Sequence, residues 1–450
     1  MKKLIITVLV CGLTVSGVFA AGGSQSSRGK TTLTFYSWAD SGAERTMLES
    51  VAADYEASHP NIHIEQNYGG TEYLSKINTM IASGTTPDVF QINEFLAIDW
   101  GEKGVAADLN PYYAKSGVKP EDMYINSYLF TSGGHLWAIG ALPATILVYY
   151  NKDLFKQAGV PEPPASATNP WTWDQFVDAA KKLTKDSNGR TPNDPGFNYN
   201  SVVQWGTVMP TPWIFWISLI YSSGISVVND TGTALALDSL AGIKAIQSIA
   251  NLAAVDKVAP SFATSVSSAF SNQPTMLMNG QLAMFMSGNW DHGSFLTEKF
   301  DVGLSQVPTF TGKGNNLTWA AGYMMKKNGS DDAFQFFQYM MDFNNWVSSA
   351  VNHNIGLPGG IPTTKNTFTD PALNAAWMSK NDPTIARVAG DIVQNAARLG
   401  ENVTVKNWAA IMDQTIAPGL ERVWMGEQTP QQALQAINSQ LAGKFQGVFK

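Results

Sequence analysis

The chain has 450 residues, a formal net charge of −7 at pH 7 and a single cysteine. This length exceeds that of one ordinary domain, so we expect two lobes. An acidic chain without basic runs argues against binding to nucleic acid or to anionic membrane surfaces.

The first residues have the features of a secretory signal peptide. Lys2 and Lys3 precede the apolar run LIITVLVCGL, and Ala20 is a small residue suited to cleavage. We expect residues 1–20 to be removed, which predicts a periplasmic or cell-surface protein. A permanent membrane anchor and a lipid-modified Cys11 are the alternatives. Because Cys11 lies inside the apolar run, the mature chain would have neither disulfides nor thiol chemistry.

The segment after this leader alternates strands and helices. Strand patterns cover residues 31–38, 61–68 and 87–93, and a helix is expected after Ser41 and again over 72–83. This order is typical of an α/β layer with a largely parallel sheet, in which ligands bind beyond the carboxyl ends of the strands. The apolar face of the first helix would be Met47, Leu48, Val51, Ala52 and Tyr55. The candidate site residues at the strand ends are Trp38, Asp40, Tyr68, Asn93 and Glu94.

The middle and the C-terminal parts are mainly helical. Thr172 is the expected cap of one helix, and Gly189 its expected end. The other predicted elements are helices at 211–224 and 240–254, strands at 280–290 and 300–310, and C-terminal helices capped by Ser330 and Thr429.

Five groups of segments occur in a familiar order along the chain. They are ASGTTPDVFQIN, LVYYNKDLFKQAGVPEPPA with WTWDQF, GQLAMFMSGNW, VPTFTGK and GEQTPQQAL. Together they resemble the extracellular solute-binding proteins of ABC importers, in the carbohydrate-binding family that includes maltose-binding protein. The resemblance implies two α/β lobes joined by a hinge, each a sheet flanked by helices, with a ligand held between them and delivered to the permease subunits.

The same resemblance implies a division of the chain between the lobes. Residues 31–141 and 303–357 would form the first lobe, and residues 142–302 and 358–450 the second. It implies no chemistry on the ligand. We expect a monomer without a cofactor. No metal site is expected either, since His59 and His63 are separated by Pro60 and are interpreted as surface residues.

By its position after SGN, Trp290 resembles the family's sugar-stacking aromatic, and Trp213 resembles an aromatic of the second lobe. Sugars present apolar C–H faces and hydroxyl edges, so an aromatic ring with polar neighbours suits them. Ala144 stands where maltose binders can carry an acid, which argues against a malto-oligosaccharide. The remaining candidates are Asn289 and Asp291 beside Trp290, and Trp319, Gly322 and Tyr323 in the run WAAGY.

Each candidate has a purely structural alternative. Trp290 could pack under its own loop, Glu94 could pair with a surface lysine, and WAAGY could be an ordinary strand. The alternative functions are a secreted glycosidase, which needs two carboxylates at one cleft, and a binder of another solute such as a peptide or an anion. Anion sites often use arginine, and none stands at the proposed strand ends.

Overall fold

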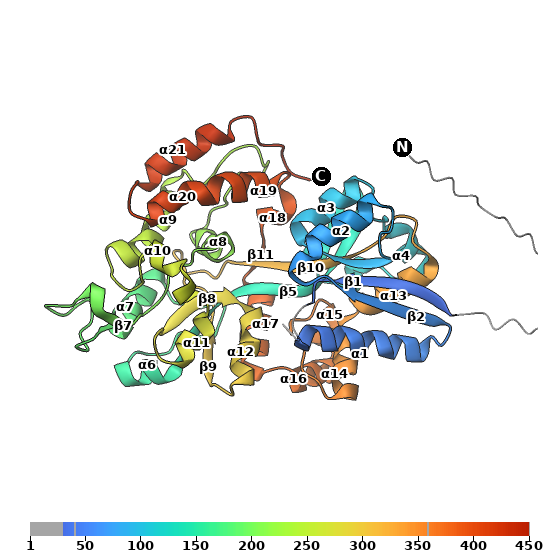
Figure 1. Ribbon diagram of the computed structural model, residues 1–450, viewed down its shortest axis with the longest axis horizontal. Helices are drawn as coiled ribbons and strands as arrows, with labels where there is room; N and C mark the ends of the chain where they lie inside the picture. The colour runs from blue at the N-terminus through green and yellow to red at the C-terminus, as the bar shows by residue number, and fades with distance from the viewer. Residues whose placement is uncertain (1–29, 40–41, 358–359, 450) are drawn as a thin grey trace, which may run out of the picture.

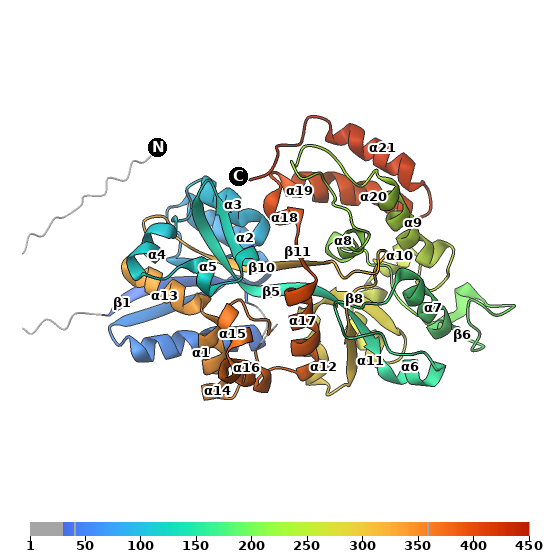
Figure 2. The ribbon, with the colours of Figure 1, turned by 180° about the vertical axis from the view of Figure 1, so that it is seen from behind.

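The computed structural model describes residues 30–39, 42–357 and 360–449. The predicted signal peptide and Asp40 lie outside the described residues. Figures 1 and 2 show the molecule from opposite sides, as two bodies of helices and strands side by side. We call the body that contains α1 to α4 the first lobe and the body that contains α6 to α9 the second lobe.

The first lobe begins with the alternating order that the sequence predicts. Its first elements are β1 (Thr31–Ser37), α1 (Gly42–Ser58), β2 (Ile62–Tyr68), α2 (Tyr73–Ala82), β3 (Val89–Ile92) and α3 (Glu94–Glu102). Strand β1 pairs in parallel with both β2 and β3. The buried face of α1 consists of the five predicted apolar residues, and Gly84 ends the turn after α2 with a positive φ of 74°.

Two long strands run from one lobe into the other (Figure 1). Strand β5 (His135–Asn151) pairs with β4 (Leu129–Ser132) in the first lobe, and with β8 (Met284–Gly288) and β9 (Val302–Ser305) in the second. Strand β10 (Asn316–Met325) is antiparallel to both β5 and β3. The sheet of the first lobe is therefore mixed, which corrects the prediction of a largely parallel sheet.

The remaining helices cover the sheets of the two lobes. In the first lobe they are α4 (Asn110–Ser116), α5 (Pro120–Met123), α13 (Asp331–Met341), α14 (Phe343–His353), α15 (Lys365–Thr369) and α16 (Pro371–Ser379). In the second lobe they are α6 (Lys152–Ala158), α7 (Trp173–Leu183), α8 (Trp213–Ser222), α9 (Leu240–Ala254), α10 (Phe262–Ser265), α11 (Gln273–Met278) and α12 (His292–Thr297). A small hairpin joins β6 (Lys185–Asp186) to β7 (Val202–Gln204).

The C-terminal part passes over both lobes. It consists of α17 (Pro383–Asn395), β11 (Ala397–Leu399), α18 (Glu401–Thr404), α19 (Trp408–Ile411), a π-helical turn (Met412–Ile416), α20 (Ala417–Trp424) and α21 (Pro430–Leu441). Ser330, Thr172 and Thr429 cap α13, α7 and α21 as predicted. Helix α7 ends at Leu183 and not near Gly189, because the chain turns into β6 at that point.

Two sets of buried side chains form the cores of the lobes. The core of the first lobe includes Phe35, Tyr55 and Tyr323, and that of the second includes Val148 and Trp216. Their distribution places the crossing on β5 between Ala141 and Ile146, and the crossing on β10 between Leu317 and Tyr323.

Long-range packing involves residues near two of the predicted lobe boundaries. Val302 and Leu304 pack among buried residues of the second lobe. Trp377 packs in the core of the first lobe, although residues 358–450 were predicted to belong to the second. Local sequence patterns do not record these contacts, because each depends on residues far away in the chain.

Helix α18 makes a third connection between the lobes. The Glu401 carboxylate accepts hydrogen bonds from the Val227 backbone N–H (2.9 Å) and from the Tyr221 hydroxyl of the second lobe. The adjacent Asn402 donates its Nδ2 hydrogen to Glu94 Oε1 at the start of α3 (2.9 Å). Glu401 and Asn402, adjacent residues of one short helix, are thus hydrogen-bonded to opposite lobes.

Candidate functional site

Trp290 stands at the edge of the second lobe, directly after β8, in a short 3-10 turn over Asn289–Asp291. Its side chain is 46% exposed. The ring lies over Gly288, where an added Cβ would come within 1.9 Å of the indole, so that only glycine leaves room for it. This close approach explains why a large aromatic residue can lie flat on its own turn.

Two further aromatic rings adjoin Trp290. Phe215 of α8 is nearly parallel to it, with ring centroids 6.5 Å apart, and Trp319 of β10 meets it at 62° with centroids 5.8 Å apart. We call Trp290, Phe215 and Trp319 the aromatic wall. Both partners are half-buried and pack against the core of the second lobe. The wall is built where β10 crosses between the lobes, and Trp319 pairs there with Ala144 of β5.

Trp213 opens α8, two residues before Phe215. Its indole Nε1–H donates to Asp413 Oδ1 over 2.7 Å, and its ring meets Trp408 edge-on with centroids 5.8 Å apart. Asp413 lies in the π-helical turn, a rare conformation that recurs at functional sites. Partial burial raises the pKa of the Asp413 carboxyl above its usual value.

Sequence reasoning missed Phe215 and Asp413. Trp216, three residues after Trp213 on α8, is fully buried and packs against Trp424. The π-helical turn that presents Asp413 has no signature in the local sequence pattern.

Trp38 and Asn93 lie at the carboxyl ends of two paired strands. β1 and β3 are in parallel register, with Tyr36 opposite Phe90, so the residues that follow them emerge side by side. The Trp38 backbone N–H donates to Gln91 Oε1 (3.2 Å), and the indole meets Tyr73 edge-on. Asn93 is the N-cap residue of α3, and its side chain makes no hydrogen bond to the other described residues. Both side chains are half-buried.

Tyr68 and Glu94, also predicted at strand ends, are engaged by the protein itself. The Tyr68 hydroxyl donates to Gln66 Oε1 (2.7 Å), and the Arg45 guanidinium covers its ring. Glu94 is buried and holds the Asn402 amide, and burial raises the pKa of its carboxyl to about 7. In this conformation neither residue presents its polar group to a ligand.

Tyr323 and Gly322 lie in the packed interior of the first lobe. Tyr323 is fully buried and stacks on Phe35 in the core of the first lobe. An added Cβ on Gly322 would lie 2.9 Å from the Phe130 ring, so this glycine serves close packing. A β-bulge opposite the Ala321–Gly322 step places one extra residue, Ala141, in β5. Along the same strand, Trp319 is half-buried near Trp290, whereas Tyr323 belongs to the core of the first lobe.

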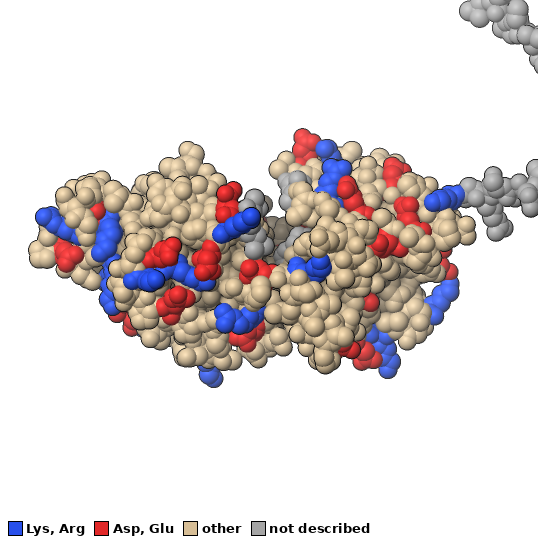
Figure 3. Space-filling view, turned by 90° about the horizontal axis from the view of Figure 1, so that it is seen from below, with Lys and Arg blue, Asp and Glu red and all other residues tan. Residues whose placement is uncertain are grey.

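Asn289 and Asp291 hold the turn that carries Trp290. Buried Asn289 accepts the Thr145 backbone N–H at Oδ1 (3.0 Å) and donates from Nδ2 to the Pro143 carbonyl (3.2 Å), which ties the turn to β5. Asp291 accepts a hydrogen bond from the Ser287 hydroxyl (2.7 Å), and its partial burial raises the pKa of its carboxyl. Seen from below, the surface is hollowed between the two lobes, and charges of both signs are interspersed on this face (Figure 3).

Two structural features bear on other classes of function. Within the described ranges, no group of three or more His, Cys, Asp or Glu side chains is arranged to hold a metal ion. None of the helices in these ranges has the length and apolar character needed to cross a membrane.

The family model of bacterial extracellular solute-binding proteins matches residues 39–342. The chain belongs to this family, which confirms the resemblance seen in the sequence. It is a family of binding proteins that act outside the cytoplasm.

Curated relatives and solved structures extend this comparison. The melibiose/raffinose/stachyose-binding protein MelE of Bacillus subtilis is 26% identical over 47% of this chain and 47% of its own. The chain thus spans about half the length of that relative. The sn-glycerol-3-phosphate-binding periplasmic protein UgpB of Brucella abortus is 24% identical over 66% of this chain and 68% of its own.

Among solved structures, an ABC substrate-binding protein from Listeria monocytogenes in complex with cycloalternan superposes with a TM-score of 0.75. It is 26% identical, over 92% of this chain and 99% of that chain. The maltose/maltodextrin-binding domain MalE from Bdellovibrio bacteriovorus, bound to maltotriose, has a TM-score of 0.68 at 18% identity, over 92% and 99% of the two chains. These similarities confirm the predicted α/β fold.

Proposed function

We propose that the protein is the substrate-binding subunit of an ABC importer, and that it holds a sugar or oligosaccharide between its two lobes. The aromatic wall is the observation that carries the proposal. An exposed indole flanked by two aromatic rings offers a flat apolar surface to the C–H face of a sugar ring. Such a surface at the crossing between two lobes lies within reach of residues from both.

Polar groups near the wall suit the hydroxyl edges of a sugar. Asp413 accepts hydrogen bonds, and the Asn93 side chain can both donate and accept. Trp38 and Asn93 would close on the ligand from the first lobe, and Trp290 and Trp213 would hold it from the second. Asn289 and Asp291 would not contact the ligand. They would instead hold the turn that positions Trp290.

A second candidate ligand is an anion, since one relative bears the name of a glycerol-phosphate binder. Arg45 is the basic residue next to the predicted strand-end residues. Its Nε donates to Glu49 over 2.9 Å, and its guanidinium lies 4.6 Å from the centroid of the Tyr68 ring. An arginine already paired with a carboxylate is a poor phosphate ligand, so the neutral sugar is favoured.

The remaining parts of the proposal concern processing and organisation. Export through a signal peptide over residues 1–20 would deliver the mature chain to the periplasm or cell surface as a monomer, without catalytic activity or a cofactor. The first lobe would comprise residues 31–141 and 323–357 with α16, and the second residues 146–317 with α19 to α21.

A thermal-shift screen tests the proposal. The mature protein is heated with melibiose, raffinose, stachyose, maltotriose, cycloalternan and sn-glycerol-3-phosphate, one at a time. A ligand that binds only the folded state raises the melting temperature in a concentration-dependent manner. We expect at least one of the neutral sugars to do so. Stabilisation by the phosphate ester alone would instead identify an anion binder, and release of smaller sugars during incubation would identify a glycosidase.

A further inference from the structure

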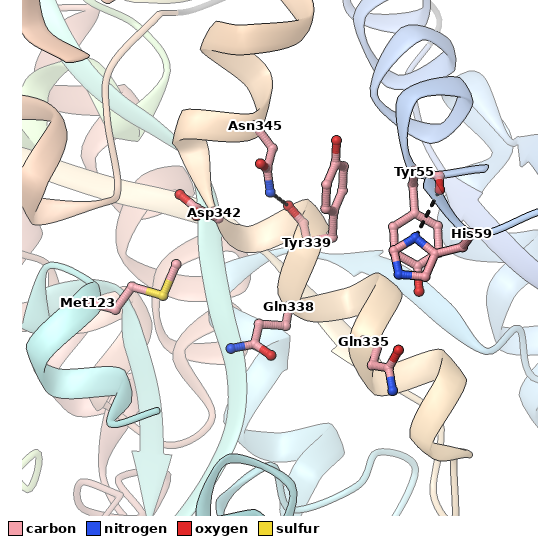
Figure 4. A pocket seen from close by; sticks show the side chains of 8 residues that line it. All are labelled: Tyr55, His59, Met123, Gln335, Gln338, Tyr339, Asp342 and Asn345. Atoms are coloured by element: carbon pink, nitrogen blue, oxygen red, sulfur yellow. Dashed lines mark hydrogen bonds between the residues drawn. The ribbon is translucent and has the colours of Figure 1, made fainter. Parts of the chain in front are cut away.

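A second pocket lies on the first lobe, among α1, α5, α13 and the start of α14 (Figure 4). Its volume is about 320 Å³, within the range of small-molecule sites. Tyr55 and His59 line it from the end of α1, which leads into the beginning of β2. The pocket is therefore at the opposite end of the sheet from Trp38, which follows the carboxyl end of β1.

One wall of this pocket is aromatic and fixed. The Tyr55 and His59 rings stack with centroids 4.0 Å apart, and Tyr339 meets Tyr55 at 5.1 Å. His59 Nδ1 lies 3.0 Å from the Tyr55 carbonyl oxygen, which orients the imidazole. Tyr55 is only 1% exposed, and its buried hydroxyl has no hydrogen-bond partner within the described part of the chain.

The pocket also carries polar groups that the protein leaves unused. The side chains of Gln335 and Gln338 and the hydroxyl of Tyr339 make no hydrogen bond to other described residues. Asn345 donates from Nδ2 to the Tyr339 carbonyl (2.9 Å), which leaves its side-chain oxygen available. Carboxamides and a phenol can each donate and accept, as a ligand with several hydroxyl groups requires.

The charge of the pocket indicates the kind of ligand. None of its lining residues is lysine or arginine, and its one carboxylate, Asp342, already accepts the Asn344 backbone N–H (3.0 Å) and side-chain amide (2.9 Å). Nothing in this lining favours an anion, and the engaged carboxylate leaves little attraction for a cation. We propose that the pocket is a second binding site, for a neutral saccharide unit that stacks on the half-buried rings of His59 and Tyr339, which the buried Tyr55 ring supports, and that hydrogen-bonds to Gln335 and Gln338.

Saturation-transfer NMR can separate this site from the one between the lobes. Raffinose and maltotriose are titrated into the mature Trp290→Ala protein, in which the interlobe site is weakened. The expected result is saturable transfer to at least one sugar. Adding Gln338→Ala should weaken that binding by roughly tenfold, since it removes hydrogen-bonding groups from the pocket. The matched control, Gln435→Ala, replaces an exposed helical glutamine of the second lobe and should change nothing.

The same titrations contain the results that would overturn the inference. They are the absence of saturable transfer with either sugar, equal binding in the Gln338→Ala and Gln435→Ala proteins, and saturable binding of sn-glycerol-3-phosphate in place of the sugars. Circular dichroism of each variant checks that the fold is retained, and Tyr339→Phe, which removes only a hydroxyl, gives a second test should Gln338→Ala not fold. The thermal-shift screen, repeated with the Gln338→Ala protein in which only the second pocket is altered, reports on the interlobe site, so the two proposals can fail independently.

Discussion

Trp290 combines high exposure with a rigid base. Its ring rests on Gly288 and between two other aromatic rings, so little conformational entropy remains to be lost when a ligand binds. We expect Trp290→Ala to weaken sugar binding by about 1–3 kcal/mol, the usual contribution of an aromatic anchor. Isothermal titration with the sugar found in the thermal-shift screen measures this loss. Leu240→Ala, which truncates an exposed apolar side chain on α9, is the control, and unchanged affinity in Trp290→Ala would show that the ring serves packing alone.

Glu94 predicts a pH dependence of stability. Burial raises the pKa of its carboxyl from 4.5 to about 7. Between these values the folded state keeps a proton that the unfolded state has released, so the free energy of unfolding falls as the pH rises through this window. The shift corresponds to at most about 3 kcal/mol.

Urea unfolding of the unaltered protein and of Glu94→Gln, compared across this window, isolates the contribution. Other groups, including His292, whose pKa is lowered by burial, titrate in both proteins and cancel in the difference. The difference in unfolding free energy should change by up to about 3 kcal/mol between the two ends of the window. Parallel curves for the two proteins would contradict the assignment.

For single residues, the sequence predicts where aromatic rings and polar groups lie along the chain, but not which of them are buried and which are exposed to a ligand. The polar neighbours of Trp290 could be read from the local sequence, and so could the strand ends of Trp38 and Asn93. The burial of Tyr323 in the core and the π-helical turn that presents Asp413 could not, because both depend on pairing and packing with distant segments.

Among the elements, α18 has an unusual position. Its Val403 packs in the core around β3, whereas Val405, immediately after the helix, packs in the core of the second lobe. Glu401 is bonded to the second lobe and Asn402 to Glu94 of the first. We therefore expect α18 to act as a hinge at the third place where the chain connects the two lobes.

Replacement of Asn402 tests this role. Asn402→Ala leaves the buried Glu94 oxygen without its donor, which should cost about 1–3 kcal/mol in the free energy of unfolding. Because the lost bond joins the two lobes, the affinity for the ligand should change as well. Asn251→Ala is the matched control for urea unfolding and titration, because the Asn251 side chain has only the exposed Gln247 side chain as its hydrogen-bond partner among the described residues. Equal effects of the two substitutions would exclude a special role for Asn402.

The elements were predicted best where local chemistry decides them. The capping boxes of α7 and α21 and the buried face of α1 follow from a few adjacent residues. The position of β10 does not, since this strand enters between β3 and β5 from far along the chain. The mixed sheet results from this insertion.

For the whole molecule, two long strands and α18 connect lobes that have separate cores. A ligand that contacts both lobes should favour their closure. Small-angle scattering should then show a smaller radius of gyration with saturating sugar than without. Binding proven by titration but accompanied by an unchanged radius would argue against closure, and would leave the permease no ligand-dependent shape to recognise.

Trp319 lies within the stretch of β10 that passes from one lobe to the other. For a rotation about this stretch, points near the axis travel least. Asn93 directly follows Ile92, which pairs with Gly322 of β10, so it lies close to the axis. Trp38 follows β1, one strand further out, and travels on a longer lever arm. A sugar resting against Trp319 would therefore stay almost in place while the opposite lobe swings over it.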